Sequence, residues 1–540
     1  MIEKIYPKGW FEYKFPEIPE RFNPIEIIID KNAEKWKNKI ALIYDTPEKS
    51  ITYTYTDLVK EVSKASNVLV NTLGLRRRNT IMIISFDSFE PLSLWLGAIR
   101  ANILPYWTSP LYLSSTIANF VKLLEPDAIF VDINYLNKLN EIPDDVRPKH
   151  IITLNGKVEE YNDYSSLYKN AMDYFEPIKM YKYAECYFLS SGGTTGFPKL
   201  SVHLATDFII IPDAHGIHYW GWSENDINYG TSQKYFTQGM WPGILMPLAL
   251  GGTGIISSRK LTADTVFHVL KTYKPTYLIT VPTIIKGLIG AAEEGKEVDL
   301  SSVKVVYVAS EKLPEALSIR FKELFSKEVF DTIGSSEITY EWIANKPGEN
   351  KIGTVGKPIY GYDVKLVDLD TDKEITEPYK SGACYIKSPT VLAWYYRNPE
   401  KSRELIIGEW FRTGDVLYFD EEGFFVHNGR VDDQFKIHGM WASSQEIEEV
   451  IQRNPKIMEV GVTNIIGKSG LSVIVAAVVL KPSYVLDEKL VSELKESVKK
   501  ELGGYKVPEI IKQFNELPRT ALQKIDRKQI KKLFETNQTV

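Results

Sequence analysis

The chain has 540 residues, in which 65 Lys and Arg stand against 70 Asp and Glu, so its formal charge is −5. Hydrophobic residues make up 44% and charged residues 25%, a globular composition that excludes a disordered chain. The acidic balance argues against a broad basic surface, and two cysteines exclude a disulfide framework. No apolar run approaches the ~20 residues that a bilayer requires, and no signal peptide is visible. We therefore expect a cytoplasmic, multidomain protein that binds neither nucleic acid nor membrane.

Helical and strand-like segments alternate through most of the chain. Residues 57–73 carry apolar side chains at helical spacing, and Ile81–Ser85 is a continuous apolar run, typical of a strand buried on both faces. The same criteria predict strands at Ala128–Val131, His150–Thr153, Tyr277–Thr280 and Val303–Val308, and helices at Phe267–Tyr273 and Pro314–Phe325. This order predicts an α/β fold, with a large N-terminal domain that is built on mostly parallel sheets.

The last hundred residues indicate a smaller unit. Ser444–Arg453 is predicted to be a helix, Val473–Leu480 a strand, and Asp487–Leu502 an amphipathic helix that ends at two glycines. This compact order predicts a small α+β domain. We place the boundary near Gly429–Asp433, which gives domains 1–431 and 432–540.

A glycine-rich segment, Ser190–Lys199 (SSGGTTGFPK), carries the strongest local signal. Its glycines let the backbone approach an anion closely. Successive N–H groups and hydroxyls can then donate to phosphate oxygens, and Lys199 adds a positive charge. The spacing differs from that of the Walker A loop. The segment therefore predicts a phosphate-binding loop.

This loop resembles that of the adenylate-forming superfamily, which includes acyl-CoA synthetases and aryl acid–AMP ligases. Four further segments resemble motifs of this superfamily in the same order: Asp331–Glu337 (DTIGSSE), Trp410–Asp415 (WFRTGD), Gly429–Gly439 (GRVDDQFKIHG) and Pro518–Ile525 (PRTALQKI). Ser232–Gly239 and Leu392–Arg403 are most similar to the benzoate–CoA ligase branch. Each motif is weak alone, but five in order are specific.

The resemblance implies an ATP-dependent acyl-CoA synthetase that joins a small carboxylic acid to CoA through an acyl-AMP. It implies Lys524 and Glu337 as catalytic residues, Mg²⁺ held by Glu337 and Thr194, Asp432 as the hinge, and CoA contacts at Lys436 and Gly439. ATP and AMP would contact Ser191, Gly192, Gly193, Thr194, Thr195, Gly196, Lys199, Ser310, Glu311, Asp331, Ser336, Asp415 and Arg430. A homodimer is one option for its assembly.

Two alternatives stay open. The acyl group can pass to a carrier protein instead of CoA. Ala383, Leu522 and Gln523 depart from the family pattern, and Gln523 stands where a glycine usually precedes the catalytic lysine. These departures favour a module that has lost catalysis, whereas the retained Lys199, Glu337, Asp415 and Lys524 argue for an active enzyme.

The acyl pocket is expected to include Phe236, Thr237, Gln238, Trp241 and Tyr340. A buried Gln238 requires a hydrogen-bond partner, and the bulk of Trp241 can shorten the cavity, although a simple core role for this tryptophan is equally plausible. We therefore expect a small aliphatic or hydroxylated acid to be a better substrate than benzoate.

Overall fold

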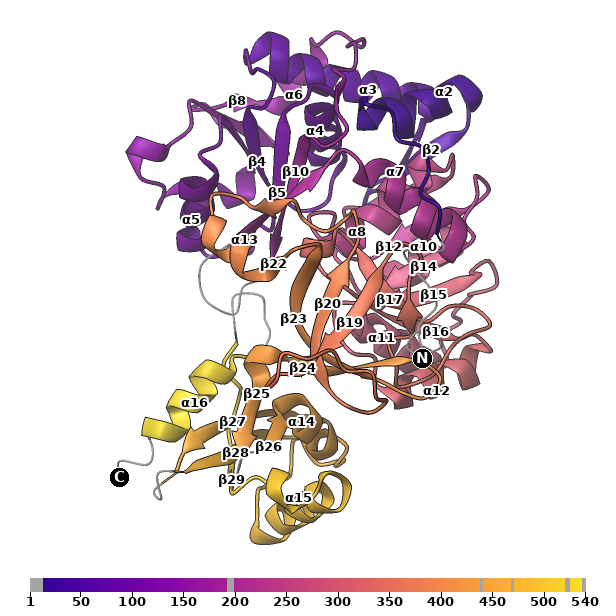
Figure 1. Cartoon of the computed structure of the whole chain (residues 1–540). Coiled ribbons are helices and arrows are strands. Elements are labelled where there is room, and N and C mark those ends of the chain that lie inside the picture. Colours follow the sequence, from indigo (N-terminus) through magenta and orange to yellow (C-terminus); the bar gives the residue numbers. More distant parts are fainter. Residues whose placement is uncertain (1–12, 192–198, 438–439, 468–470, 520–524, 537–540) are drawn as a thin grey trace. The chain divides into compact units, whose positions relative to one another are not determined.

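The computed structural model describes residues 13–191, 199–437, 440–467, 471–519 and 525–536 (Figure 1). The chain divides into two compact units. One contains the described residues up to Val364 together with Ile386–Phe411 and Glu421–Phe425. The other contains Lys365–Tyr385, Arg412–Asp420 and the described residues from Val426 onward. The second unit thus includes Lys365–Tyr385 and Arg412–Asp420, which precede the predicted boundary at 431/432. The boundary itself stays a prediction.

An eight-stranded sheet forms one half of the larger unit. Its strands from β10 to β8 pair in parallel, whereas β11 and β21 add antiparallel strands at one edge. The order is β21 (Trp394–Tyr395), β11 (Lys199–Leu204), β10 (Glu185–Ser191), β5 (Leu104–Thr108), β4 (Thr80–Ile84), β6 (Ala128–Asp132), β7 (His150–Leu154) and β8 (Asn162–Asp163). Every residue of β4, β5 and β6 is buried, which explains their unbroken apolar runs.

A nine-stranded sheet forms the other half. Its six central strands run parallel, with antiparallel strands at both edges. The order is β18 (Lys357–Pro358), β17 (Glu341–Ala344), β16 (Val329–Gly334), β15 (Val305–Val308), β14 (Tyr277–Thr280), β12 (Ile227–Gly230), β13 (Thr253–Ser257), β2 (Ile40–Asp45) and β3 (Ser50–Thr54). The predicted α/β class with mostly parallel sheets is confirmed.

The helices of this unit include the predicted ones. Residues 57–73 form α3 (Tyr55–Asn67) and a short π-helical turn at Val68–Thr72. The helix begins two residues before the predicted start because Thr54 and Asp57 form a reciprocal capping box. The other main helices are α4 (Phe89–Arg100), α5 (Ser114–Leu124), α7 (Asp207–Ile211), α8 (Thr237–Met240), α10 (Ala263–Tyr273), α11 (Pro282–Glu293), α12 (Glu315–Phe325) and α13 (Pro399–Leu405).

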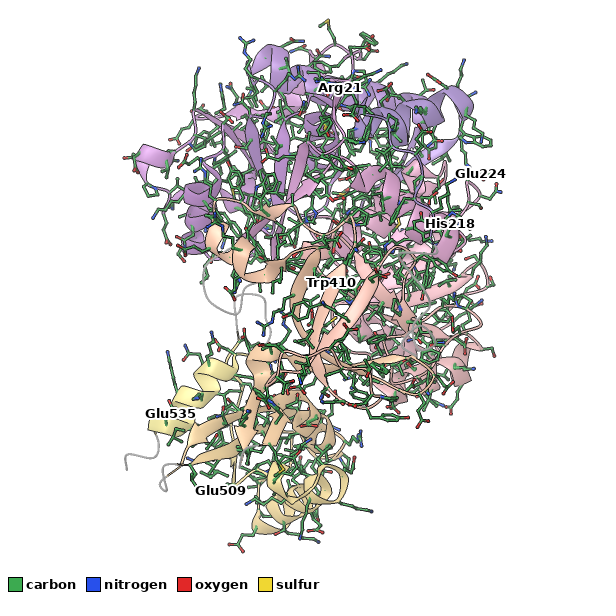
Figure 2. All side chains as sticks on the ribbon, viewed as in Figure 1. Arg21, His218, Glu224, Trp410, Glu509 and Glu535 are labelled. Carbon is green, nitrogen blue, oxygen red and sulfur yellow. The ribbon has the colours of Figure 1, made fainter. Side chains whose placement is uncertain are left out.

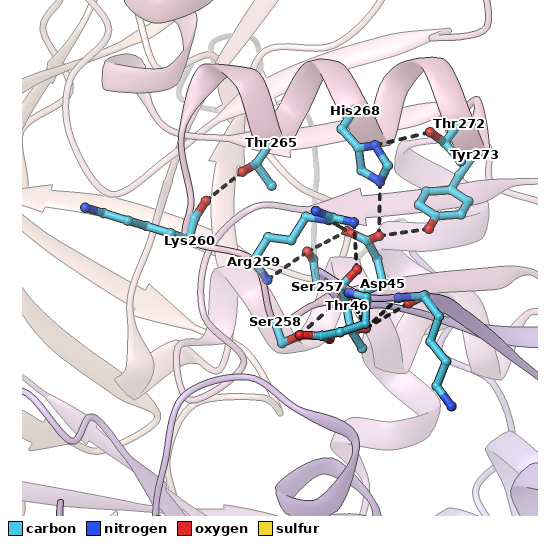
Figure 3. Close-up of polar contacts among 12 residues, drawn as sticks. Asp45, Thr46, Ser257, Ser258, Arg259, Lys260, Thr265, His268, Thr272 and Tyr273 are labelled. Atoms are coloured by element: carbon cyan, nitrogen blue, oxygen red, sulfur yellow. Dashed lines mark hydrogen bonds and ion pairs between the residues drawn. The ribbon is translucent and has the colours of Figure 1, made fainter. Parts of the chain in front are cut away.

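A buried carboxylate ties three elements of the nine-stranded sheet together. Asp45, the last residue of β2, accepts hydrogen bonds from Ser257 at the end of β13, from Arg259, and from His268 and Tyr273 on α10 (Figure 3). These four donors lie at 2.9–3.1 Å and occupy both carboxylate oxygens. The cluster is therefore a structural anchor, since it leaves Asp45 no lone pair aimed at a ligand.

The second unit ends in a three-stranded sheet of β27 (Ile457–Ile466), β28 (Ser472–Leu480) and β29 (Ile510–Gln513). Alternate residues of β28 enter two cores, one that includes side chains of α14 (Ser444–Gln452) and α15 (Glu488–Leu502) and another that includes side chains of α16 (Arg527–Thr536). Burial on both faces explains the apolar sequence of β28, and the predicted C-terminal helices and strand are confirmed.

Further strands lie between these parts in the sequence. They are β19 (Asp363–Val367), β20 (Gly382–Lys387), β22 (Ile406–Ile407), β23 (Trp410–Phe419), β24 (Phe425–Arg430), β25 (Gln434–Ile437) and β26 (Met440–Ser443). Trp410, which begins β23, is labelled in Figure 2. Among the described residues, none of the helices is both long and apolar enough to cross a membrane.

Candidate active site

The glycine-rich segment lies between two paired strands. β10 leads into it and β11 leads out, and the backbones of Ser191 and Lys199 are partners across this antiparallel pair. Gly192, Gly193, Thr194, Thr195 and Gly196 lie outside the described residues. Beyond β11, β21 brings Tyr395 opposite Ser201. The Lys199 ammonium lies 5.9 Å from the centre of the Tyr395 ring, which places this lysine at the loop exit beside an aromatic face.

Glu337 lies in a short 3₁₀ turn, Ser336–Ile338, that follows β16. Its side chain is half-buried. The Tyr395 hydroxyl donates to Glu337 Oε1 at 3.1 Å, and the Leu392 N–H donates to the Glu337 carbonyl at 2.6 Å. Ser336 adds a contact from its hydroxyl to Glu337 Oε2 at 3.3 Å. The structure therefore brings Lys199, Glu337 and Tyr395 together at one edge of the eight-stranded sheet.

Asp331 is buried within β16 and ties the chain after β15 to this strand. Its carboxylate accepts backbone N–H groups of Leu313 at 3.2 Å and Thr332 at 3.0 Å. Burial raises the pKa of Asp331 to about 7, against the opposing effect of these two donors. Ser310 and Glu311 are exposed. Ser310 has a φ of 76°, a conformation that glycine adopts more readily.

Asp415 and Arg430, both predicted to contact the nucleotide, lie in contact within the second unit. Arg430 Nη1 lies 3.0 Å from Asp415 Oδ1, and His427 Nε2 lies 3.3 Å from the same oxygen. Burial would raise the pKa of Asp415, but the charge of Arg430 and the hydrogen bond from His427 outweigh it and lower the pKa to about 2. A Cβ on Gly414 would lie 2.8 Å from Arg430 Nη2, so glycine leaves the space that this arginine occupies.

The predicted hinge and CoA contacts also lie in the second unit. Asp432 is exposed in a short 3₁₀ turn, Val431–Asp433. Lys436 Nζ lies 2.6 Å from Asp370 Oδ1 and 4.9 Å from the centre of the Trp441 ring. Gly439 and Lys524 lie outside the described residues. Arg519 and Ile525, which flank the segment of Lys524, form an isolated antiparallel bridge.

A small pocket lies where β5 and β10 end. Side chains nearly fill it, and its walls are Trp95, Trp107, Tyr187, Phe188, Leu189, Lys234, Tyr235, Met240, Trp241 and Leu245. Trp241 is 1% exposed and packs 5.2 Å from Phe208 between ring centres. The position of the pocket, directly before the glycine-rich segment, makes it a candidate for the acyl group.

Of the five residues predicted for the acyl pocket, only Trp241 is among the described residues that line this cavity. Phe236 is exposed, and Thr237 is half-buried. Tyr340 is buried with its hydroxyl 2.6 Å from that of Tyr307. Gln238 is buried, and its Nε2 has no hydrogen-bond partner among the described residues. These four assignments stay predictions.

Three polar residues near the site were missed by the sequence argument. Tyr395 lies within Leu392–Arg403, which served only to identify the subgroup. His427 stands three residues before Arg430, so it could have been found by asking which side chains share the strand of that arginine. His203 reaches the carbonyl of Ser336 at 2.7 Å from 133 residues away, and nothing in the sequence indicates that contact.

Family models match both parts of the chain. The model described as AMP-binding enzyme matches residues 29–396, and the model described as AMP-binding enzyme C-terminal domain matches residues 446–524. These matches cover more than half of the chain and include the glycine-rich segment, Asp331–Glu337 and Lys524. The chain therefore belongs to the AMP-binding enzyme family, whose members form adenylates.

Two curated relatives and one crystal structure are similar to this chain over most of its length. The chain is 29% identical to a benzoate–CoA ligase from Thauera aromatica over 518 residues, which covers 95% of this chain and 96% of the relative. It is 28% identical to 4-hydroxybutyrate–CoA ligase 1 from Metallosphaera sedula, covering 95% and 90% of the two chains. The crystal structure of the anthranilate CoA ligase AuaEII with anthranoyl-AMP matches with a TM-score of 0.87 at 26% identity, covering 97% and 99%.

Proposed function

We propose that the protein is an ATP-dependent acyl-CoA synthetase that activates a small monocarboxylic acid as acyl-AMP and transfers the acyl group to CoA. The observation that carries this proposal is the grouping of Lys199, Glu337 and Tyr395 around the strands that flank the glycine-rich segment. The relatives named as CoA ligases support CoA as the acceptor. AMP and pyrophosphate are the expected by-products.

The first half-reaction develops negative charge on the α-phosphate and on the leaving pyrophosphate. Backbone N–H groups and hydroxyls of the glycine-rich segment, together with Lys199, would stabilise that charge. Asp415 is well suited to accept ribose hydroxyls, because its lowered pKa keeps it ionised at neutral pH. Lys524 would contact the α-phosphate and the substrate carboxylate in this step.

Mg²⁺ would enter the site with ATP, since Mg²⁺ takes one or two carboxylates along with phosphate oxygens and water. Glu337 offers one carboxylate at the edge of the sheet and fits this requirement. The described residues contain no group of three or more His, Cys, Asp or Glu side chains that could hold a metal by themselves. When bound, the ion would neutralise charge on the phosphate oxygens.

The second half-reaction needs a different set of residues. Lys436 and Gly439 would line the path of the pantetheine arm, and Asp432 would be the hinge about which residues 432–540 rotate between the two steps. The exposure of Asp432 in a short turn supports a hinge at this point. Closure of this kind can exclude water from the adenylate. We retain a cytoplasmic location and a homodimer as predictions.

The pocket before the glycine-rich segment supports a small monocarboxylic acid. Trp241 is one of its walls, and Lys234 is the only charged residue among the described residues that line it. The Lys234 ammonium already contacts Asp87 Oδ2 at 3.3 Å and the carbonyls of Gly230 and Ser232 at 3.0 Å. These contacts use its three donors, so the pocket gives a second substrate carboxylate no cation to pair with.

Gln238 does not line this cavity and stays a predicted contact; if its unpaired amide faces the acyl group, it favours an acid that brings a hydroxyl acceptor. The similarity to a 4-hydroxybutyrate–CoA ligase agrees with this choice. A screen of AMP release with CoA over aromatic, short aliphatic and hydroxylated acids tests the proposal. Acceptance of a carrier-protein thiol but not CoA would favour the carrier-protein alternative, and failure of every acid to support exchange of pyrophosphate into ATP would favour the inactive module.

A further inference from the structure

The turn that carries Glu337 ends at a strained residue. Thr339 has φ 74° and ψ −43°, and its side chain is fully buried. A β-branched residue rarely adopts positive φ, because its side chain then crowds the backbone. Such a conformation persists only where the surroundings fix it. The strained residue lies two residues after Glu337, which indicates that surrounding contacts hold this turn in one conformation.

Hydrogen bonds to one histidine fix both ends of the turn. His203, on β11, has Nε2 2.7 Å from the carbonyl of Ser336 and Nδ1 2.7 Å from the hydroxyl of Thr339. The Thr339 hydroxyl also lies 2.8 Å from the carbonyl of Thr390 and 3.2 Å from Asp207 Oδ2. His203 therefore bridges the residues on either side of Glu337.

The available hydrogens limit which of these contacts can form together. The Ser336 carbonyl can only accept, so His203 Nε2 carries a hydrogen. Thr339 has one hydroxyl hydrogen, and the Thr390 carbonyl can also only accept. The Thr339 hydroxyl can therefore donate to only one of its neighbouring acceptors at a time, the Thr390 carbonyl or Asp207 Oδ2. Tyr187 completes the cluster by donating to Asp207 at 2.9 Å.

The side chain of Glu337 is fixed independently of this cluster. The Tyr395 hydroxyl donates to Glu337 Oε1, and the Leu392 N–H donates to the Glu337 backbone carbonyl. His203 and Asp207 are fully or almost fully buried, and the hydrogen bonds described for them go to Ser336, Thr339 and Tyr187 rather than to Glu337. Their effect on Glu337 must therefore pass through the backbone of the turn.

We propose that His203 and Thr339 are positioning residues, which hold the Ser336–Thr339 turn so that the Glu337 carboxylate receives Mg²⁺ together with ATP. This inference rests on the proposed function, because it takes Glu337 as the Mg²⁺ ligand. The loss of either positioning residue should weaken the gain in ATP affinity that Mg²⁺ provides. It should leave the affinity for ATP without metal unchanged.

Two matched pairs of variants test this on the full chain. His203→Leu removes both ring nitrogens, whereas His203→Gln keeps a donor that can reach the Ser336 carbonyl. Thr339→Val removes the hydroxyl but keeps the branched shape, whereas Thr339→Ser keeps the hydroxyl. Titration calorimetry with ATP, in Mg²⁺ and in EDTA, measures the metal-dependent gain for each protein, and circular dichroism checks the fold.

We expect His203→Leu and Thr339→Val to reduce the Mg²⁺-dependent gain in ATP affinity at least fivefold. We expect His203→Gln and Thr339→Ser to stay within threefold of the unaltered protein. Equal gains in all variants, or equal losses with and without Mg²⁺, would overturn the inference. If His203→Leu does not fold, the Thr339 pair decides alone. An unaltered protein that does not bind ATP at all would overturn the proposed function together with this inference.

Discussion

Replacing Trp241 with glycine should change which acids the protein activates. The indole is 1% exposed, lines the pocket before the glycine-rich segment, and packs on Phe208. Its removal would free the volume of a bicyclic ring in the wall of the pocket. Longer or aromatic acids should therefore gain in kcat/KM relative to butyrate.

The size of the effect follows from burial. Truncating a buried tryptophan costs about 3–5 kcal/mol of folding stability, so the variant should unfold at a lower temperature when no ligand is bound. An aromatic acid that fills the space should recover part of that loss, whereas butyrate should not. Gln238 does not line the pocket, but if its unpaired amide faces a bound phenyl ring, as predicted from the sequence, the cost is about 1–3 kcal/mol, or roughly a tenfold to hundredfold disadvantage for benzoate.

The assay is kcat/KM for benzoate, butyrate and 4-hydroxybutyrate on the unaltered protein and on Trp241→Gly, with Trp241→Phe as the intermediate size. We expect the unaltered protein to prefer butyrate or 4-hydroxybutyrate. Trp241→Gly should move the preference toward benzoate, with Trp241→Phe between them. A preference of the unaltered protein for benzoate of tenfold or more, about 1.4 kcal/mol, would refute this account of the pocket and leave the adenylation chemistry intact.

Three further predictions concern catalysis and stability. Lys524→Ala should abolish adenylation but spare thioester formation from supplied acyl-AMP, as measured by pyrophosphate exchange and CoA consumption; equal loss of both steps would contradict it. Gly439→Leu should do the reverse, and unchanged CoA turnover would remove this glycine from the pantetheine path. Glu341 is buried, and burial raises its pKa to about 8, so it stabilises the fold while protonated and loses that contribution as pH rises from about 5 through 8. Glu341→Gln should reduce the fall in unfolding free energy between pH 6 and 9 by up to about 3 kcal/mol in urea titrations, and an unchanged slope would contradict the buried, protonated state.

Local patterns in the sequence predicted much of the fold. The run Tyr277–Thr280 matches β14 residue for residue, because four consecutive buried positions between polar breaks leave little alternative to a central strand. The start of α3 was placed two residues late, because a threonine–aspartate capping box fixed it instead of the first apolar residue. The predicted elements follow local spacing, which a sequence displays directly.

Contacts in the site were predictable only where the two contacting residues lie in the same motif or in neighbouring motifs. Asp415 and Arg430 lie 15 residues apart in recognisable segments, and their contact follows from their proposed roles. Tyr395 reaches Glu337 across 58 residues, and His203 reaches Thr339 across 136. Such contacts depend on which strands become neighbours in the sheet, and no periodicity in the sequence reports that order.

The most direct test of the central claim is exchange of labelled pyrophosphate into ATP, followed by addition of CoA, with the best acid from the screen. We predict exchange that depends on that acid and needs no CoA. CoA should then yield acyl-CoA and AMP in equal amounts. Formation of ADP and phosphate, or acyl-CoA production without acid-dependent exchange, would contradict an acyl-AMP intermediate.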